Sequence, residues 1–149
     1  GTFIFGYDHD TPASFRESLD FAREEGLFIA AFNHITPFPG TPLYTRLEEE
    51  GRLLYDAWWL DPRYRYGEVP FTPRGMDPEA LAEHCIRARK EFYGWPSIAQ
   101  RAVKRVNRRD PWMLTNFLAI NAMHQVDVSG RNGLPLGDEG WNGELLEAG

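Results

Sequence analysis

The stretch GTFIFGYDHDTPASFRESLDFAREEGLFIAAF, residues 1–32, decides the fold of this chain. It opens with an apolar run over residues 1–6 and closes with another over residues 27–32, and both runs are apolar on alternating faces. Strands buried on both faces have this pattern, which is typical of parallel sheets covered by helices. Between the runs, apolar residues recur at helical spacing: Phe15, Leu19 and Ala22. The sequence therefore predicts a βαβ unit with a right-handed crossover.

Helix starts are marked by a capping residue followed by proline, a pair that occurs at Thr11-Pro12, Thr41-Pro42, Asp77-Pro78 and Asp110-Pro111. Such a pair places an oxygen at the N-cap and a preset φ at the first helical position. The first pair predicts a helix over residues 12–25, ended by Gly26, and the second a helix over residues 42–50. From Asp77 onward, apolar stripes predict three helices, with breaks near residues 94–96 and at Asn107.

These elements divide the chain into four segments. Residues 1–52 hold the βαβ unit and the helix after it, and residues 53–76 form an irregular connector. Residues 77–129 are expected to form a mainly α-helical accessory domain, and residues 130–149, rich in glycine and acidic side chains, a flexible tail. The predicted fold class is therefore α/β followed by α-helical structure. Because the chain starts without Met and enters a strand directly, we expect it to be a fragment of a longer protein.

Composition excludes several classes of function. The chain has 149 residues, 42% of them hydrophobic, which is enough to bury a core, and a net charge of -6, so nucleic acid is an unlikely partner. No apolar run reaches the roughly 20 residues that cross a bilayer, and we expect a reducing, cytoplasmic setting. The single cysteine, Cys85, lies on an apolar helical stripe and cannot form an internal disulfide or a cysteine-ligated metal centre by itself.

Two features could carry chemistry. The proline-rich loop over residues 36–42 follows the second predicted strand, at the end of the sheet where α/β folds bind ligands. His34 stands just before this loop and is the candidate catalytic residue, with a structural histidine bonded to the loop as the alternative. Gly6 ends the first strand and would let a ligand approach the backbone, or would serve packing alone.

The same segments carry a resemblance to a known family. Ile4-Phe5-Gly6-Tyr7-Asp8-His9-Asp10-Thr11 and Phe32-Asn33-His34-Ile35-Thr36-Pro37-Phe38-Pro39-Gly40 resemble the last two strands of the radical S-adenosylmethionine (radical SAM) barrel, a partial TIM-type barrel. The resemblance is closest to the cobalamin-binding branch, which includes hopanoid methylases and the anaerobic Mg-protoporphyrin IX monomethyl ester cyclase. Further motifs resemble the uncharacterised domain that follows this barrel: residues 58–62, 74–79, 89–93 and 133–137.

The resemblance implies a set of cofactor-binding residues: Ile4, Gly6, Asn33, His34 and Thr36. It implies S-adenosylmethionine, a 4Fe-4S cluster and cobalamin in the full-length protein. The three-cysteine loop that holds the cluster and the cobalamin domain both lie upstream in that family and are missing here. We therefore expect no metal ligands, no cofactor and no catalysis from this piece alone, although the parent protein would be an enzyme.

The partners implied are the upstream part of the same barrel, the cobalamin domain and a small-molecule or lipid-like substrate. Two strands alone expose unpaired edges, so a homodimer through these strands is also expected. A rival hypothesis is a non-catalytic interaction module, whose contact surface would be the basic helices between Arg87 and Arg109. The plain alternative for this basic run is a solvated helical face.

Overall fold

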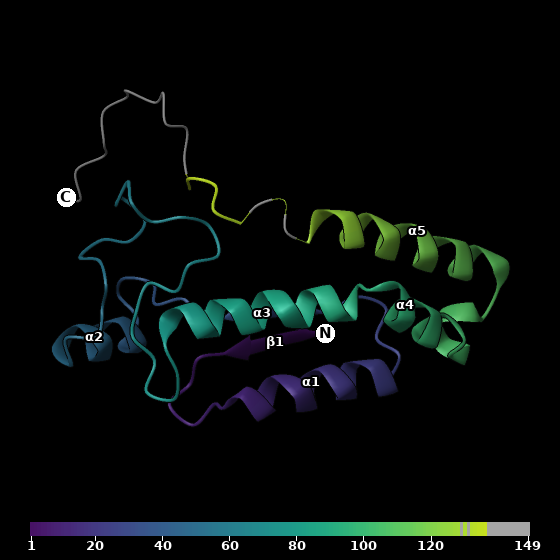
Figure 1. Ribbon diagram of the computed structural model, residues 1–149, viewed down its shortest axis with the longest axis horizontal. Helices are drawn as coiled ribbons and strands as arrows, with labels where there is room; N and C mark the ends of the chain where they lie inside the picture. The colour runs from purple at the N-terminus through teal and green to yellow at the C-terminus, as the bar shows by residue number, and fades with distance from the viewer. Residues whose placement is uncertain (129, 131, 137–149) are drawn as a thin grey trace.

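In the computed structural model, residues 1–128, 130 and 132–136 are described. The elements follow one another along the chain as β1 (Thr2–Phe5), α1 (Pro12–Glu24), β2 (Ala31–His34), α2 (Pro42–Glu49), α3 (Pro78–Phe92), α4 (Trp95–Ala102), the short 3-10 helix η1 (Arg105–Arg108) and α5 (Pro111–Asp127). In Figure 1, β1 lies between α1 and α3, α2 and the connector lie at one end, and α4, η1 and α5 at the other. The architecture is mixed α/β, as predicted.

The predicted βαβ unit is present. β1 and β2 are parallel, with Phe3 opposite Phe32 and Ile4 opposite Asn33. The predicted capping of α1 is confirmed, because Thr11 and Ser14 form a capping box and Gly26 has a φ of 68° after the last turn. Within the described residues the sheet has these two strands only.

The second strand was predicted at residues 27–32 and that position is wrong, since β2 covers Ala31–His34. Residues before it form the turn out of α1, in which the Leu27 N–H donates to the Ala22 carbonyl. The carbonyls of Leu27 and Phe28 accept hydrogen bonds from the side chain of Arg101. Within this apolar run Ala30 and Phe32 are buried, whereas Ile29 is 41% exposed and the residues before it are half-buried. The first carbonyls of the run bond to a helix instead of a neighbouring strand.

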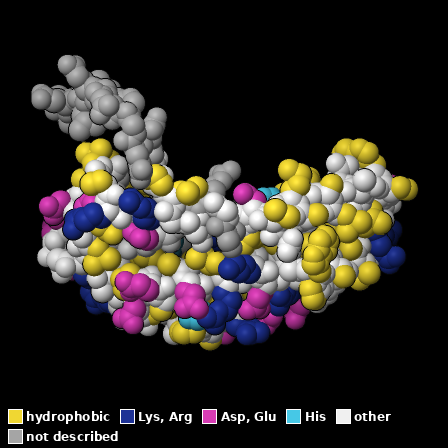
Figure 2. Space-filling model, turned by 45° about the horizontal axis from the view of Figure 1, so that its top comes forward, with side chains coloured by type: hydrophobic (Ala, Val, Ile, Leu, Met, Phe, Trp, Pro, Cys, Tyr) yellow, Lys and Arg dark blue, Asp and Glu magenta, His cyan; other side chains and the backbone are white. Residues whose placement is uncertain are grey.

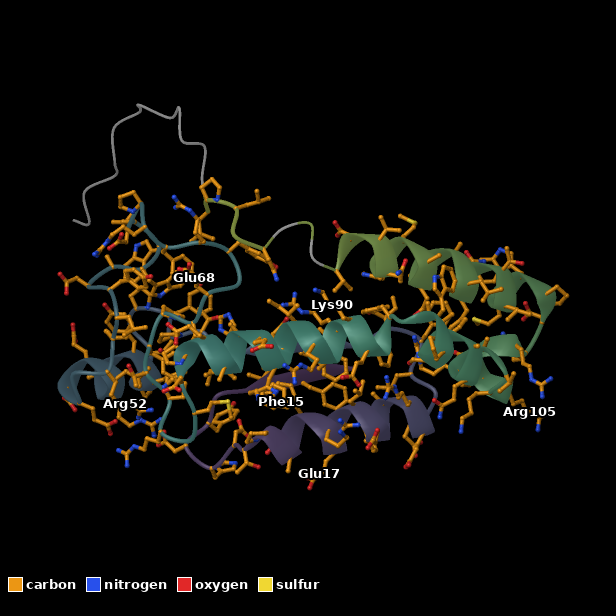
Figure 3. The ribbon with its side chains drawn as sticks, viewed as in Figure 1. Phe15, Glu17, Arg52, Glu68, Lys90 and Arg105 are labelled. Atoms are coloured by element: carbon orange, nitrogen blue, oxygen red, sulfur yellow. The ribbon has the colours of Figure 1, made fainter. Side chains whose placement is uncertain are left out.

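The two faces of the sheet differ. Phe5 stacks on Phe15 of α1 at 4.0 Å between ring centroids, and Phe32 packs on Phe92 of α3 at 5.6 Å. Figure 3 shows Phe15 in the layer between α1 and α3. The opposite face carries the alternate residues, of which Ile4 is 47% exposed and Asn33 is also exposed. The prediction of strands buried on both faces is therefore wrong for this chain, because helices cover one face only.

The connector is irregular but packed. It buries Trp58, Tyr64 and Phe71, and Phe71 forms an antiparallel bridge with Leu53. Part of the segment predicted as a tail lies against it: the Tyr66 N–H donates to the Leu134 carbonyl, and the Gly133 N–H donates to the Tyr66 carbonyl. Residues 131 and 137–149 of that predicted tail lie outside the described residues.

A buried arginine links the turn before β2 to the C-terminal helices. Arg101, on α4, is 0% exposed, and it donates to the carbonyls of Leu27 and Phe92 at 2.8 Å each and to Asn121 Oδ1 on α5 at 3.0 Å. Its guanidinium also lies 3.7 Å from the centroid of the Phe92 ring. Burial lowers the Arg101 pKa to about 10, so the group is still charged at neutral pH. The turn before β2 and the helices α3, α4 and α5 are thus linked through one cation.

We expect Arg101→Met to destabilise the chain by at least about 3 kcal/mol, since several buried oxygens would lose their donor and each orphaned acceptor costs about 1–3 kcal/mol. Urea unfolding followed by circular dichroism measures the difference. Arg105→Met, at an exposed arginine of η1, is the matched control and should change the free energy of unfolding by less than about 0.5 kcal/mol. Equal effects of the two substitutions would contradict the role given to Arg101.

Candidate functional site

An open hollow of about 500 Å³ lies on the uncovered face of the sheet. Four of the five predicted cofactor-binding residues line it: Ile4, Asn33, His34 and Thr36. Ile4 and Asn33 are opposite each other in the parallel register, so their side chains project to the same face. Figure 2 shows one face of the molecule, on which apolar and charged side chains are interspersed.

Gly6, the fifth predicted residue, does not line this hollow. Its φ of 105° disfavours any residue with a side chain, and a Cβ there would lie 2.9 Å from a methyl of Leu81 and 3.2 Å from one of Ile35. Its N–H donates to Asp10 Oδ2 at 2.8 Å, as does that of Tyr7 at 2.9 Å. Glycine is therefore required here by the backbone turn and by packing.

His34 borders the hollow in its neutral form. Its Nδ1 lies 3.1 Å from the Ile35 carbonyl and so carries the proton, which leaves Nε2 as the unprotonated nitrogen. Burial lowers the His34 pKa, the charge of Arg89 lowers it further, and the Ile35 carbonyl opposes both effects. A neutral imidazole at the mouth of the hollow can accept a hydrogen bond or a proton from a ligand.

The rest of the lining comes mainly from aromatic residues of the loops: Tyr7, Phe38, Trp58, Tyr64 and Tyr66. Trp58 also donates from Nε1 to the Pro37 carbonyl at 2.9 Å, which holds the proline-rich loop against the connector. The residue that sequence reasoning missed is Arg89, which reaches the hollow from α3. In the sequence, Arg89 belongs to the motif at residues 89–93, but it also falls in the basic run between Arg87 and Arg109, to which the rival hypothesis assigns it.

The basic run between Arg87 and Arg109 is not one surface. Arg87 pairs with Glu83 at 2.6 Å on the same helix, and Arg89 lines the hollow. The prediction that Arg101 belongs to an exposed contact surface is wrong, because Arg101 is buried and its guanidinium donates to carbonyls inside the fold. Arg105 and Arg108 are exposed on η1, and Figure 3 shows Arg105 pointing away from the molecule.

The described residues contain no group of three or more histidine, cysteine or acidic side chains that could hold a metal ion. Cys85 is buried in the core, and burial raises the pKa of its thiol to about 12, so it is a thiol at neutral pH and a poor nucleophile or metal ligand. Across the same described ranges, no helix is both long enough and apolar enough to cross a membrane.

Comparison with known proteins now identifies the family. Residues 41–128, more than half of the chain, match the model of a domain of unknown function (DUF4070), and the chain belongs to this family. Because the match begins at α2, the family domain covers the connector and the C-terminal helices but leaves out the βαβ unit.

Three curated relatives are similar to this chain. Bacteriochlorophyllide d C-12(1)-methyltransferase of Chlorobaculum tepidum is 33% identical over 68% of this chain and 21% of the relative. Bacteriochlorophyllide d C-8(2)-methyltransferase of the same organism is 25% identical over 69% of this chain and 22% of the relative. Hopanoid C-2 methylase of Rhodopseudomonas palustris is 28% identical over 77% of this chain and 24% of the relative.

The predicted kinship with the hopanoid methylases is thereby confirmed. The chain spans between a fifth and a quarter of the length of these relatives. No solved structure gives a significant match.

A pH dependence follows from the lowered His34 pKa. The unfolded chain binds the histidine proton near pH 6.5, whereas the folded chain binds it only at lower pH, so stability falls as the pH drops through this interval. When the pH is lowered from 7.5 to 5.5, we expect the free energy of unfolding of the unmodified chain to fall by up to about 1 kcal/mol more than that of His34→Gln. Urea unfolding at both pH values measures this difference. His9→Gln, at an exposed histidine, should behave as the unmodified chain. An unchanged pH dependence in His34→Gln would contradict this prediction.

Proposed function

We propose that this chain is the C-terminal part of a radical SAM methyltransferase, in which it forms one wall of the barrel mouth and covers the substrate. The observation that carries the proposal is that four residues expected from the radical SAM resemblance line a single hollow on the uncovered face of the sheet. The names of the relatives, two methyltransferases and one methylase, support methyl transfer as the reaction. Cyclisation, as in the Mg-protoporphyrin IX ester cyclase, is the other reaction of the class.

The hollow fits the adenosyl part of S-adenosylmethionine, since Ile4 presents an exposed apolar side chain and the aromatic residues around it provide flat surfaces. When bound to a reduced cluster, this cofactor supplies a 5'-deoxyadenosyl radical. In our proposal Ile4 packs against the adenine, while the Asn33 amide and the Thr36 hydroxyl provide hydrogen bonds that orient the bound molecule. His34 lines the same hollow, and its Nε2 would serve as a hydrogen-bond acceptor.

A 4Fe-4S cluster does not fit the residues of this chain. The sequence has one cysteine, and Cys85 is buried between helices with a raised pKa. We therefore propose that the cluster, and cobalamin if it is used, are held by the upstream barrel and cobalamin domain of the complete protein, which would also pair with the free edge of β1. The single reduced thiol is in keeping with a cytoplasmic setting.

The proposal is tested in the complete protein, reconstituted with iron and sulfide under reducing conditions. We expect 5'-deoxyadenosine to form from S-adenosylmethionine, and Asn33→Ala to lower its yield about tenfold, the equivalent of losing one hydrogen bond of about 1.4 kcal/mol. Asn116→Ala, at a half-buried position of α5 that does not line the hollow, is the matched control and should leave the yield unchanged. Absence of 5'-deoxyadenosine from the reconstituted protein would remove the radical SAM proposal, and equal yields from the two variants would remove the site.

A second candidate function is favoured by the tip formed by η1 and its flanks. Val103, Val106 and Trp112 are 64%, 62% and 72% exposed there, and Arg105 and Arg108 alternate with them without an ion pair in the described part of the chain. Figure 2 shows apolar side chains gathered at this end of the molecule, with cationic ones at its edge. Apolar groups interspersed with cations suit an anionic lipid surface, into which the valine side chains can insert. Single-stranded nucleic acid could stack on Trp112 but would not use the valines.

We expect the chain to sediment with vesicles containing phosphatidylserine at low salt, and the double variant V106D/W112D to lose most of this binding. Raising the salt concentration should weaken it, because the arginines contribute through screened charge. Single-stranded DNA is the comparison ligand. No binding to vesicles at low salt, with or without salt-sensitive binding to DNA, would argue against a membrane-facing tip.

A further inference from the structure

The hollow on the open sheet face has one charged side chain in its lining, that of Arg89. No aspartate or glutamate lines it among the described residues, and His34 is neutral at physiological pH because burial and Arg89 lower its pKa. The remaining lining residues are apolar, aromatic or uncharged polar. A space with one cation and no anion of its own attracts a ligand that brings a negative charge.

The Arg89 guanidinium is available for such a ligand. Its protein contact within the described residues is a 3.4 Å hydrogen bond from Nε to the Cys85 carbonyl of its own helix, and no carboxylate there lies within ion-pair distance. Two other arginines of the helical region are engaged, since Arg87 pairs with Glu83 and Arg101 donates to oxygens inside the fold. Arg89 is also half-buried, so the hydrogen bonds it offers are screened less than those of an exposed arginine.

Position places this cation between two hollows. Besides the space of about 500 Å³, Arg89 lines a neighbouring one of about 280 Å³ together with Asn33, Tyr66 and Asp127. Asp127 is not within ion-pair distance of Arg89. Asn33 and Tyr66 border both spaces as well, so the three side chains stand where the hollows meet. A ligand that fills the larger hollow with an apolar body can therefore reach Arg89 with a polar end.

We propose that the hollow binds a ligand with a flat, apolar body and a carboxylate, and that Arg89 recognises the carboxylate. The inference rests on the proposed function and names the chemical class of ligand, substrate or cofactor, that the same site takes. A carboxylate suits the planar guanidinium, which binds it with two parallel hydrogen bonds. A phosphate ester would carry more charge than one arginine balances. The aromatic side chains of Trp58, Tyr7 and Tyr66 provide the surfaces against which a flat body packs.

The test uses a matched pair of fluorescent probes, 1-pyrenebutyrate and 1-pyrenebutanol, which share the ring system and differ in the carboxylate. Titrated into the 149-residue chain, the acid is expected to bind about tenfold more tightly than the alcohol, and Arg89→Gln to abolish this preference while binding the alcohol as before. Arg89→Lys should keep part of the preference, since it retains charge without the planar fork. Arg87→Gln, two positions earlier on α3 and exposed, is the control and should keep the full preference.

Circular dichroism of Arg89→Gln confirms that it is folded before the comparison. Equal affinity for acid and alcohol in the unmodified chain, a preference that survives in Arg89→Gln, or no binding of either probe would overturn the proposal. A second pair separates two sources of carboxylate: S-adenosylhomocysteine carries one and 5'-methylthioadenosine does not. If the pyrene pair shows the Arg89-dependent preference and the nucleoside pair does not, the carboxylate belongs to the substrate. If the nucleoside pair shows a preference at least as large as that of the pyrene pair, the carboxylate belongs to the cofactor.

These binding measurements need no cluster and no radical. Failure of the carboxylate site would leave 5'-deoxyadenosine formation by the complete protein unaffected as a test of the proposed function. Conversely, a protein that makes no 5'-deoxyadenosine could still show the Arg89-dependent preference. The two outcomes are therefore distinguishable.

Discussion

The structure depends on one buried cation. Arg101 has no carboxylate partner among the described residues and instead donates to the carbonyls of Leu27 and Phe28, in the turn before β2, and of Phe92, at the end of α3. A charge inside a protein is costly unless it is fully hydrogen-bonded, and here the bonds come from elements separated by as many as 74 positions in the sequence. Asn107 adds to this arrangement, since its Nδ2 donates to the carbonyls of Gly26 and Arg101. The C-terminal helices are thus tied by polar contacts to the turn between α1 and β2.

Within the described residues, helices cover one face of the two-stranded sheet. The aromatic residues of β1 and β2 pack against α1 and α3, and the alternate residues remain on the open face, where the connector and the proline-rich loop surround them. An open face with unpaired strand edges is unusual in a finished domain and is expected where further strands complete a barrel. The same geometry explains why the predicted ligand residues and Arg89 meet on that face.

Much of this was predictable because it is encoded locally. The proline-marked starts of α1, α2, α3 and α5 agree with the four capping pairs, and Gly26 ends α1 as expected. The position of β2 was not predictable, since an apolar run predicts burial of residues 27–32 but does not indicate which groups their carbonyls bond to. Four of the residues that the family resemblance implies, Ile4, Asn33, His34 and Thr36, line the hollow, and their role in cofactor binding stays a prediction. Gly6 lies outside the hollow, at a backbone turn packed against Leu81 and Ile35.

The sequence by itself determined the βαβ unit, the helix starts and the presence of a single cysteine, because caps, periodicity and composition act over a few residues. The tertiary structure alone decided which environment each arginine side chain occupies, because the sequence does not distinguish one arginine from another. Arg101 became an internal anchor, Arg89 a cation facing a hollow, and Arg105 a surface group. The physical reason is that the cost of a buried charge depends on which distant oxygens surround it, and only the folded chain brings those oxygens together.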